Sequence, residues 1–173
     1  MDRAPASGAG CTGSSPVRRA TIGKTMNIAV IGGHECSPQI SKIAEEIGKG
    51  IAKMGATLIC GGLTGVMEAS CRGAKSCGGK TIGILPGHDK KEANPYVDIP
   101  IATGLGYMRN NLVVKNAEIV IAINGKEGTL SEIAFALQMK KLTLGINTWE
   151  IPGVIKVKSA QEAIGWIKRR KDA

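Results

Sequence analysis

Short aliphatic runs that end in glycine, alternating with helical segments, limit the folds open to this chain more than any other feature of its sequence. Runs that are apolar at nearly every position are typical of strands buried on both faces of a parallel sheet. Such runs occupy residues 27–31, 57–60, 81–85, 97–101, 119–123, 143–146 and 154–157, and the fourth is the weakest. The first three are followed directly by Gly32-Gly33, Gly61-Gly62 and Pro86-Gly87.

Amphipathic helices are expected between these runs. Ser37 offers an N-cap before Pro38 at the first helical position, and apolar residues then recur at helical spacing as far as Met54. Ser159 and Glu162 have the spacing of a capping box at the start of a last helix. Other helices are expected over 65–76, 107–116 and 129–140. The alternation predicts an α/β fold, a Rossmann-like doubly wound parallel sheet with helices on both faces, in a single domain.

The first 25 residues differ from the rest of the chain. They are rich in Ala, Ser, Gly, Thr and Arg, and they have neither hydrophobic periodicity nor the apolar segment of a secretory signal. Met26 opens the first strand as a natural initiator would. We therefore expect residues 1–25 to be a disordered tail, either vector-derived or an over-called upstream start. Residues 26–173 are expected to form a Rossmann-like nucleotide-binding domain.

The net charge of +9 is concentrated at the two ends of the chain. Residues 1–25 and 168–173 each carry +3 of it. Basic tails are a weak sign of specific DNA or RNA recognition, and five aromatic residues are too few for base-stacking platforms. The hypothesis of a nucleic-acid-binding module is therefore supported only by the charge of the two tails. We expect no specific nucleic-acid partner. The sequence has no run of about 18 apolar residues, so no membrane span is expected.

Cysteine usage indicates a reducing environment. The chain has an odd number of cysteines and no CxxC pair: Cys11, Cys36, Cys60, Cys71 and Cys77. This is the pattern of a reduced, cytoplasmic protein rather than a disulfide scaffold. With only His34 and His88 as further soft ligands, we expect no metal site.

The glycines at the strand ends predict where a ligand binds. In a doubly wound sheet, ligands lie beyond the carboxyl ends of the strands, near the switch in strand order. Glycine lets the backbone approach a ligand, and the start of a following helix presents free N–H groups to an anion. The alternative is that these glycines only make tight turns. Their occurrence at Gly32-Gly33, Gly61-Gly62 and residues 124–128, three equivalent ends, favours a phosphate or another anionic ligand.

Two common nucleotide-binding motifs are excluded. Gly79-Lys80-Thr81 resembles the end of a P-loop, but position 74 is alanine where the loop needs glycine, and the segment enters a strand rather than a helix. The G-x-G-x-x-G fingerprint is absent after the first strand. The second strand ends without the acidic residue that would bind a ribose diol, so an NAD-dependent dehydrogenase is disfavoured.

Residues 106–137 contain the densest set of candidate site residues. Thr129 and Glu132 have the spacing of a capping box, which is a purely structural explanation for both. Gly128 and Thr129 at this helix start would equally suit a phosphate, with Glu132 one turn further along, beside a sugar. Spacing alone does not decide whether Arg109 belongs to the site or is an ordinary surface cation.

Two stretches carry a resemblance to a known family. The segment GGLTGVMEASCRGAKSCGGKTIGILPG at 61–87, and the segment from Met108-Arg109 to GTLSEIAFAL, resemble the LONELY GUY (LOG) family. The LOG family is often labelled "lysine decarboxylase-like", and the molybdenum cofactor carrier proteins are its relatives. The resemblance covers about residues 26–163. It implies a Rossmann-like fold that assembles as a homodimer or homotetramer.

The resemblance also implies roles for individual residues. In LOG enzymes a PGGxGTxxE motif binds the phosphate of a nucleoside 5′-monophosphate, and its glutamate acts with an upstream arginine in cleaving the N-glycosidic bond. Carried over, Glu132 and Arg109 would be catalytic. Gly125, Gly128 and Thr129 match the phosphate-binding part of the motif. Together with the strand-end glycines and their neighbours, the expected ligand-binding residues are Gly32, Gly33, Gly61, Gly62, Gly65, Met108, Gly125, Lys126, Gly128 and Thr129.

Three departures from the motif leave the function open between two classes. Asn124 replaces the proline, Lys126 the second glycine, and Asn110 the lysine that follows the arginine. The sequence GTLSEIAFAL is more similar to the carrier branch than to the cytokinin-activating enzymes. We therefore expect binding of a phosphorylated nucleotide-like ligand, as in a carrier of molybdenum cofactor (molybdopterin), with a nucleoside monophosphate phosphoribohydrolase as the alternative. Neither a lysine decarboxylase activity nor a pyridoxal phosphate or NAD cofactor is indicated.

Deleting residues 1–25 should leave both the melting temperature and ligand binding unchanged, because this segment lacks any core-forming pattern. Thermal unfolding of the full chain and of a chain that starts at Met26 makes the comparison. A loss of several degrees on truncation would show that the tail docks on the fold.

Overall fold

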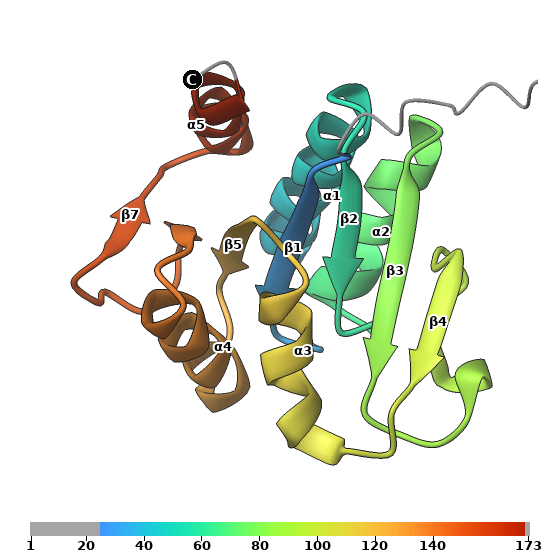
Figure 1. The fold of residues 1–173 in the computed structure, drawn as a ribbon. Helices are drawn as coiled ribbons and strands as arrows, with labels where there is room; N and C mark the ends of the chain where they lie inside the picture. The colour runs from blue at the N-terminus through green and yellow to red at the C-terminus, as the bar shows by residue number, and fades with distance from the viewer. Residues whose placement is uncertain (1–24, 172–173) are drawn as a thin grey trace, which may run out of the picture.

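A parallel sheet of seven strands runs through the molecule in the order β4-β3-β2-β1-β5-β6-β7 (Figure 1). This computed structural model describes residues 25–171, so the predicted disordered tail at 1–25 lies outside the described residues but for Thr25. The strands are β1 (Asn27–Gly32), β2 (Thr57–Cys60), β3 (Lys80–Leu85), β4 (Ile99–Ala102), β5 (Ile119–Ile123), β6 (Leu142–Ile146) and β7 (Val154–Lys156).

Helices cover both faces of this sheet (Figure 1). The α-helices are α1 (Pro38–Lys53), α2 (Val66–Ser76), α3 (Asn110–Lys115), α4 (Glu127–Gln138) and α5 (Ala160–Lys171), with 3₁₀ turns η1 (Lys90–Glu92) and η2 (Gly106–Arg109). Helices α1, α2 and α5 share one hydrophobic cluster with the sheet, and α3 and α4 share the other. The predicted single-domain, doubly wound α/β fold is confirmed.

The alternation of side chains along β1 explains the continuous aliphatic runs. Ile28 and Val30 are buried in the cluster under α1 and α2, whereas Ala29 and Ile31 are buried in the cluster under α3 and α4. Successive side chains of a strand point to opposite faces, and both faces here are covered. The four buried positions of the strand, residues 28–31, are therefore all apolar.

The switch in strand order lies between β1 and β5. From β1 the chain adds β2, β3 and β4 outward on one side, and it then returns to pair β5 with the other side of β1. All neighbouring strands are parallel, so their carboxyl ends lie at one edge of the sheet. The ends of β1 and β5 meet there, which is where a ligand site is expected in this fold.

The predicted helix starts are mostly confirmed. Ser37 caps α1 by accepting a hydrogen bond from the Ile40 N–H, and Pro38 is the first helical residue. Before α5, the Ser159 hydroxyl accepts from the Glu162 N–H at 3.2 Å. The Glu162 carboxylate accepts in return from the N–H of Lys158 at 2.8 Å, one residue earlier than in a standard capping box.

Several predicted boundaries differ from the structure, and two of these lie between β3 and α3. The fourth strand begins at Ile99 rather than at residue 97, and the helix predicted from 107 begins as the 3₁₀ turn η2, with α3 starting at Asn110. Val97 and Asp98 are not in the strand because side-chain hydrogen bonds, not the sheet, position this segment.

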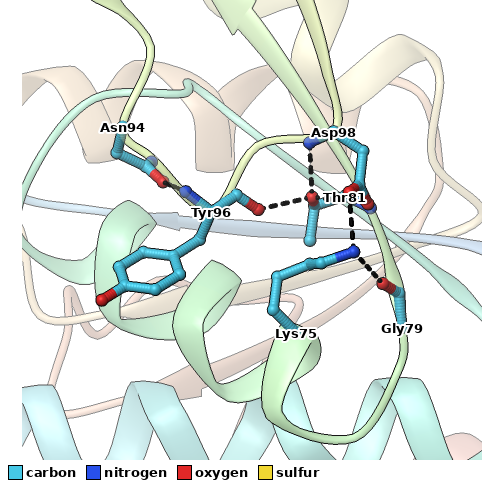
Figure 2. Close-up of polar contacts among 6 residues, drawn as sticks. All are labelled: Lys75, Gly79, Thr81, Asn94, Tyr96 and Asp98. Atoms are coloured by element: carbon cyan, nitrogen blue, oxygen red, sulfur yellow. Dashed lines mark hydrogen bonds and ion pairs between the residues drawn. The ribbon is translucent and has the colours of Figure 1, made fainter.

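Figure 2 shows these hydrogen bonds around Thr81. The Thr81 hydroxyl donates to the Tyr96 carbonyl at 2.7 Å and accepts from the Asp98 N–H at 2.9 Å. Lys75, near the end of α2, donates to the Asp98 carboxylate at 2.6 Å and to the Gly79 carbonyl at 3.2 Å. The connection between β3 and β4 is thereby fixed to the start of β3.

Helices α1 and α2 approach each other closely at two glycines. A Cβ at Gly73 would lie 2.0 Å from the carbonyl oxygen of Glu45, and a Cβ at Gly48 would lie 2.0 Å from that of Ser70. Gly165 in α5 is different, since a Cβ there would lie 3.8 Å from the nearest atom outside its own helix backbone.

Replacing these glycines with alanine should therefore have opposite effects. Gly73→Ala should lower the free energy of unfolding by about 1–3 kcal/mol, because the added methyl overpacks the helix crossing. Gly165→Ala should raise it by up to about 1 kcal/mol through helix propensity. Urea unfolding of both variants measures the difference, and a stabilising Gly73→Ala would show that the two helices are not in close contact.

Candidate functional site

A cavity of about 410 Å³ lies at the carboxyl edge of the sheet, at the switch point between β1 and β5. It is lined by the residues that follow β1, β2, β3 and β5, by η2 and by the start of α4. Most of the predicted site residues meet here: Gly32, Gly33, Gly61, Arg109, Gly125, Lys126, Gly128, Thr129 and Glu132.

Three predicted ligand-binding residues do not line the cavity: Gly62, Gly65 and Met108. The Gly62 carbonyl accepts hydrogen bonds from Asn94, and the Met108 side chain is 73% exposed. Gly65 has φ +67°, and a Cβ there would lie 2.4 Å from the Gly33 carbonyl oxygen. Gly62 and Gly65 therefore pack against residues around the cavity and do not form part of its lining.

Several lining residues escaped the sequence analysis: His34, Glu35, Leu63, Pro86, Tyr107 and Asn110. Four of these residues follow the ends of β1, β2 or β3, and Tyr107 and Asn110 lie within two residues of Arg109. The sequence signal that could have identified them was therefore their position after a predicted strand or close to Arg109. Their residue types, taken alone, point to no common chemistry.

The start of α4 forms one end of the cavity. Its first hydrogen bond within the helix runs from the Leu130 N–H to the Lys126 carbonyl at 3.0 Å, and no side chain caps the helix. A Cβ on Gly128 would meet no atom within 4 Å. The backbone N–H groups of Gly128 and Thr129 precede this first helical bond, and both residues line the cavity, as an anion site at a helix start requires.

The capping box that was the structural alternative for Thr129 and Glu132 does not form, since the N-cap of α4 is Lys126. Helix α4 begins at Glu127, two residues earlier than predicted, so Thr129 already lies in the first turn. The chain turns into the helix early because Asn124 and Gly125 both have positive φ, at +51° and +97°. A Cβ at Gly125 would lie 2.0 Å from the Thr129 hydroxyl oxygen, so this turn requires glycine.

The loop before α4 departs from the PGG sequence of the LOG motif in its conformation as well as in its residues. A proline ring holds φ near about −65°, which the +51° of Asn124 excludes. Lys126 lies in an extended conformation with φ −112°, where a side chain imposes no strain. Side chains from the chain after β6 hold this loop, since Thr148 donates to the Asn124 carbonyl and Trp149 to the Lys126 carbonyl.

Arg109 and Glu132 form a buried pair beside this helix start. The two residues are 7% and 6% exposed, and Arg109 Nη1 lies 3.8 Å from Glu132 Oε1. Arg109 also donates to the Gly61 carbonyl at 3.3 Å and to the Asn110 side chain. Its buried Nε has no hydrogen-bond partner among the described residues. A buried donor without a partner costs about 1–3 kcal/mol, and an oxygen atom of a ligand would remove this cost.

Burial controls the ionisation of this pair. It raises the pKa of Glu132 to about 8, against the opposing effect of the Arg109 charge. Burial also lowers the pKa of Arg109, which the Glu132 charge opposes. At neutral pH the Glu132 carboxyl is therefore mostly protonated in the ligand-free protein.

Two asparagines position the walls of the site. Asn110 donates to Ser131 at 3.1 Å, and because its oxygen accepts from Arg109, it links η2 to α4. Asn94, buried in the β3–β4 connection, donates to the Leu63 carbonyl at 2.8 Å and to the Gly62 carbonyl at 3.2 Å. Asn110 replaces the family's lysine with a residue that orients the arginine.

Within residues 25–171 there is no group of three or more His, Cys, Asp or Glu side chains that could hold a metal ion. In the same part of the chain, no helix is both long enough and apolar enough to cross a lipid bilayer.

The parallel sheet and the cavity at the switch point between β1 and β5 define a Rossmann-like protein whose candidate site lies at the carboxyl edge of its sheet. The model of the SLOG cluster4 family matches residues 25–171. The chain belongs to this family, and the predicted relationship to LOG and molybdenum cofactor carrier proteins is confirmed.

Solved structures of a molybdenum cofactor binding protein and of a molybdenum cofactor carrier protein are similar to this chain. A molybdenum cofactor binding protein from Rippkaea orientalis has a TM-score of 0.81 and 35% identity, over 86% of this chain and 98% of its own. The molybdenum cofactor carrier protein of Chlamydomonas reinhardtii has a TM-score of 0.79 and 32% identity, over 87% of this chain and 100% of its own.

Relatives found by sequence include both an uncharacterized protein and an enzyme. An uncharacterized protein of Archaeoglobus fulgidus is 42% identical over 83% of this chain and 95% of its own. A cytokinin riboside 5′-monophosphate phosphoribohydrolase of Mycobacterium tuberculosis is 31% identical over 55% of this chain and 52% of its own.

The raised pKa of Glu132 predicts the pH dependence of stability. The folded protein binds this proton more tightly than the unfolded chain does, so its stabilising contribution is fully present below pH 4.5 and is lost as pH rises through about 8. Relative to Glu132→Gln, the parent should therefore lose up to about 1.4 kcal/mol per pH unit within this window.

Urea unfolding between about pH 5 and pH 9 measures this trend. Glu150→Gln is the control, because a hydrogen bond from Lys156 lowers the pKa of exposed Glu150, so its contribution to stability changes only below about pH 4.5 and should give no trend between pH 5 and pH 9. A constant difference between the parent and Glu132→Gln would mean that Glu132 titrates as an ordinary carboxyl.

Proposed function

We propose that this protein binds a phosphorylated, nucleotide-like ligand at the carboxyl edge of its sheet and serves as a carrier of molybdenum cofactor. The observation that carries the proposal is the open start of α4 beside buried Arg109, whose Nε has no hydrogen-bond partner within residues 25–171. An N-terminal helix turn and a buried cation are both complementary to a phosphate. The similarity to a molybdenum cofactor binding protein and to a molybdenum cofactor carrier protein supports the choice of cargo.

The residues of the cavity suit such a cargo. The N–H groups around Gly128 and Thr129 would receive the phosphate, and Arg109 would donate to its oxygens. Lys126 adds a positive charge at the same end of the cavity. The volume of about 410 Å³ is within the range of small-molecule sites.

A phosphoribohydrolase is the second candidate, and the burial of Arg109 and Glu132 together supports it. In this reaction the C1′–N bond breaks, the base leaves with a proton, and water adds to C1′. An ionised carboxylate beside the ribose would stabilise the oxocarbenium-like transition state. Arg109 would hold the phosphate.

Two features favour the carrier function over the enzymatic one. With a pKa raised to about 8 by burial, Glu132 is mostly neutral at pH 7, which is the wrong form for stabilising positive charge. The loop over residues 124–126 departs from the conformation that a proline-containing motif requires.

We further propose that the chain forms a homodimer or homotetramer in the cytoplasm. The outer edge of β4 supports an interface between copies. Ile99 and Ile101 are 53% and 43% exposed on this strand, and β4 has no further neighbour in the described sheet. An exposed apolar edge strand is prone to association unless it is covered.

Gly128→Asp should abolish the binding of nucleoside monophosphates and leave the fold intact. The new carboxylate would lie where the ligand phosphate binds, and it should weaken AMP binding by at least about 100-fold through charge repulsion. In the first turn of α4 the same charge is favourable to the helix, so the melting temperature should stay the same or rise.

Calorimetric titration with AMP tests this expectation, with Gly165→Asp as the control that adds the same charge in α5. Equal AMP affinity in Gly128→Asp and the parent would place the phosphate elsewhere.

Incubation with AMP and other nucleoside monophosphates, followed by an assay for free base, separates the two candidates. If the protein is the enzyme, base is released and Glu132→Gln lowers the rate by about 100-fold or more, the scale of losing one preorganised electrostatic group. The rate of the parent should then rise with pH up to about 8, as Glu132 ionises. A carrier releases no base from any monophosphate.

A further inference from the structure

Tyr107 combines two features that the proposed function leaves unexplained. Its side chain is 83% exposed, and it is the one Phe, Tyr or Trp among the described residues that line the cavity. It lies in η2, between Gly106 and the buried Arg109. An exposed aromatic ring at the mouth of a cavity gains contact area when a planar ligand stacks on it.

We infer that Tyr107 is the stacking surface for the planar heteroaromatic ring of the ligand, at the end of the cavity opposite the phosphate. This inference rests on the proposed phosphate site at α4. It specifies that the ligand has a purine- or pterin-like ring in addition to its phosphate.

The order of strands separates the two ends of the cavity. Gly125, Gly128 and Thr129 follow β5, whereas Pro86 follows β3, and β1 and β2 lie between these strands. Neighbouring strands are about 4.8 Å apart, so three spacings place the two ends roughly 14 Å apart. A phosphate alone would occupy only the β5 end. A phosphate, a sugar or pyran unit and a planar ring laid end to end would extend across the span.

The β3 end is suited to a ring rather than to a second charged group. Its walls include Leu63 and Pro86, which offer apolar surface. The carbonyl of Leu63 is held by Asn94, and Figure 2 shows Asn94 hydrogen-bonded to the Tyr96 N–H within the β3–β4 connection. Lys126 belongs to the phosphate end, and Arg109, which pairs with Glu132 and donates to the Gly61 carbonyl after β2, lies between the two ends. The start of η2 lies at the β3 end, since the Gly106 N–H donates to the Pro86 carbonyl at 3.0 Å.

A second copy of the chain is the competing occupant for this aromatic surface. Leu105 and Met108, which flank Tyr107, are also exposed, at 50% and 73%. They do not line the cavity, whereas Tyr107 does. This difference favours a ligand at Tyr107 and makes coverage by a second copy an outcome of the test.

The test compares ligands with and without a ring. Calorimetry measures the affinities of AMP, of a pterin that carries one phosphate ester, and of ribose 5-phosphate for the parent, Tyr107→Ala, Tyr107→Phe and Leu105→Ala. Tyr107→Ala should weaken the tighter ring-bearing ligand by at least about tenfold and leave ribose 5-phosphate within about twofold. Tyr107→Phe, which keeps the ring, should restore the affinity, and Leu105→Ala should bind as the parent does.

Each of the following results would overturn the inference. Unchanged affinity of Tyr107→Ala for the ring-bearing ligand would exclude stacking, and equal weakening of ribose 5-phosphate would indicate a general disturbance of the site. A change of oligomeric state in both Tyr107→Ala and Leu105→Ala, with ring affinity unchanged, would assign the surface to a second copy. If the parent binds ribose 5-phosphate but neither ring-bearing probe, the inference fails while the phosphate site stands. If it binds none of the three, both fail.

Discussion

The burial of the Arg109 guanidinium is the constraint on which the rest of the site depends. The guanidinium contacts the end of β2 through Gly61, the start of α3 through Asn110, and α4 through Glu132. A buried cation is stable only where polar groups surround it. These contacts explain why three elements far apart in the sequence converge at one edge of the sheet, and why Asn110 rather than a second cation follows the arginine. These contacts leave the Arg109 Nε without a hydrogen-bond partner among the described residues, and an oxygen atom of a ligand would supply one.

The same burial determines which chemistry the site favours. A carboxyl beside an arginine is usually ionised, but at Glu132 desolvation outweighs the attraction and raises the pKa to about 8. A neutral acid and a desolvated cation beside an open helix start suit the binding of an anion. Cleavage of a glycosidic bond would require the bound ligand to change this balance toward the carboxylate. Anion binding and bond cleavage would therefore require different protonation states of the Glu132 carboxyl.

The fold could be predicted because periodicity is a local signal that the tertiary structure preserves. The aliphatic runs became strands, and the glycines at their ends marked the edge of the sheet at which the cavity lies. The placement of Gly32, Gly33, Gly61 and the 125–129 segment followed from topology, since carboxyl ends of parallel strands share an edge.

The remaining details depended on contacts between distant residues. Gly62 and Gly65 resemble the other strand-end glycines in sequence, yet they pack against β3 and the β1–α1 loop. The true start of α4 depends on the positive φ of Asn124 and Gly125, which a capping-box pattern does not reveal. Asn94 lies about thirty residues from the carbonyls that it binds, so nothing near it in sequence marks its role.

Titration of the isotopically labelled protein with AMP, followed by the backbone amide NMR signals, tests the central claim most directly. If the phosphate binds at the start of α4, the largest shifts should fall on the amides of Gly125, Gly128 and Thr129. Shifts concentrated instead on the basic residues of α5 would contradict a phosphate site at the switch point of the sheet. So would a spectrum without any chemical shift change at saturating AMP.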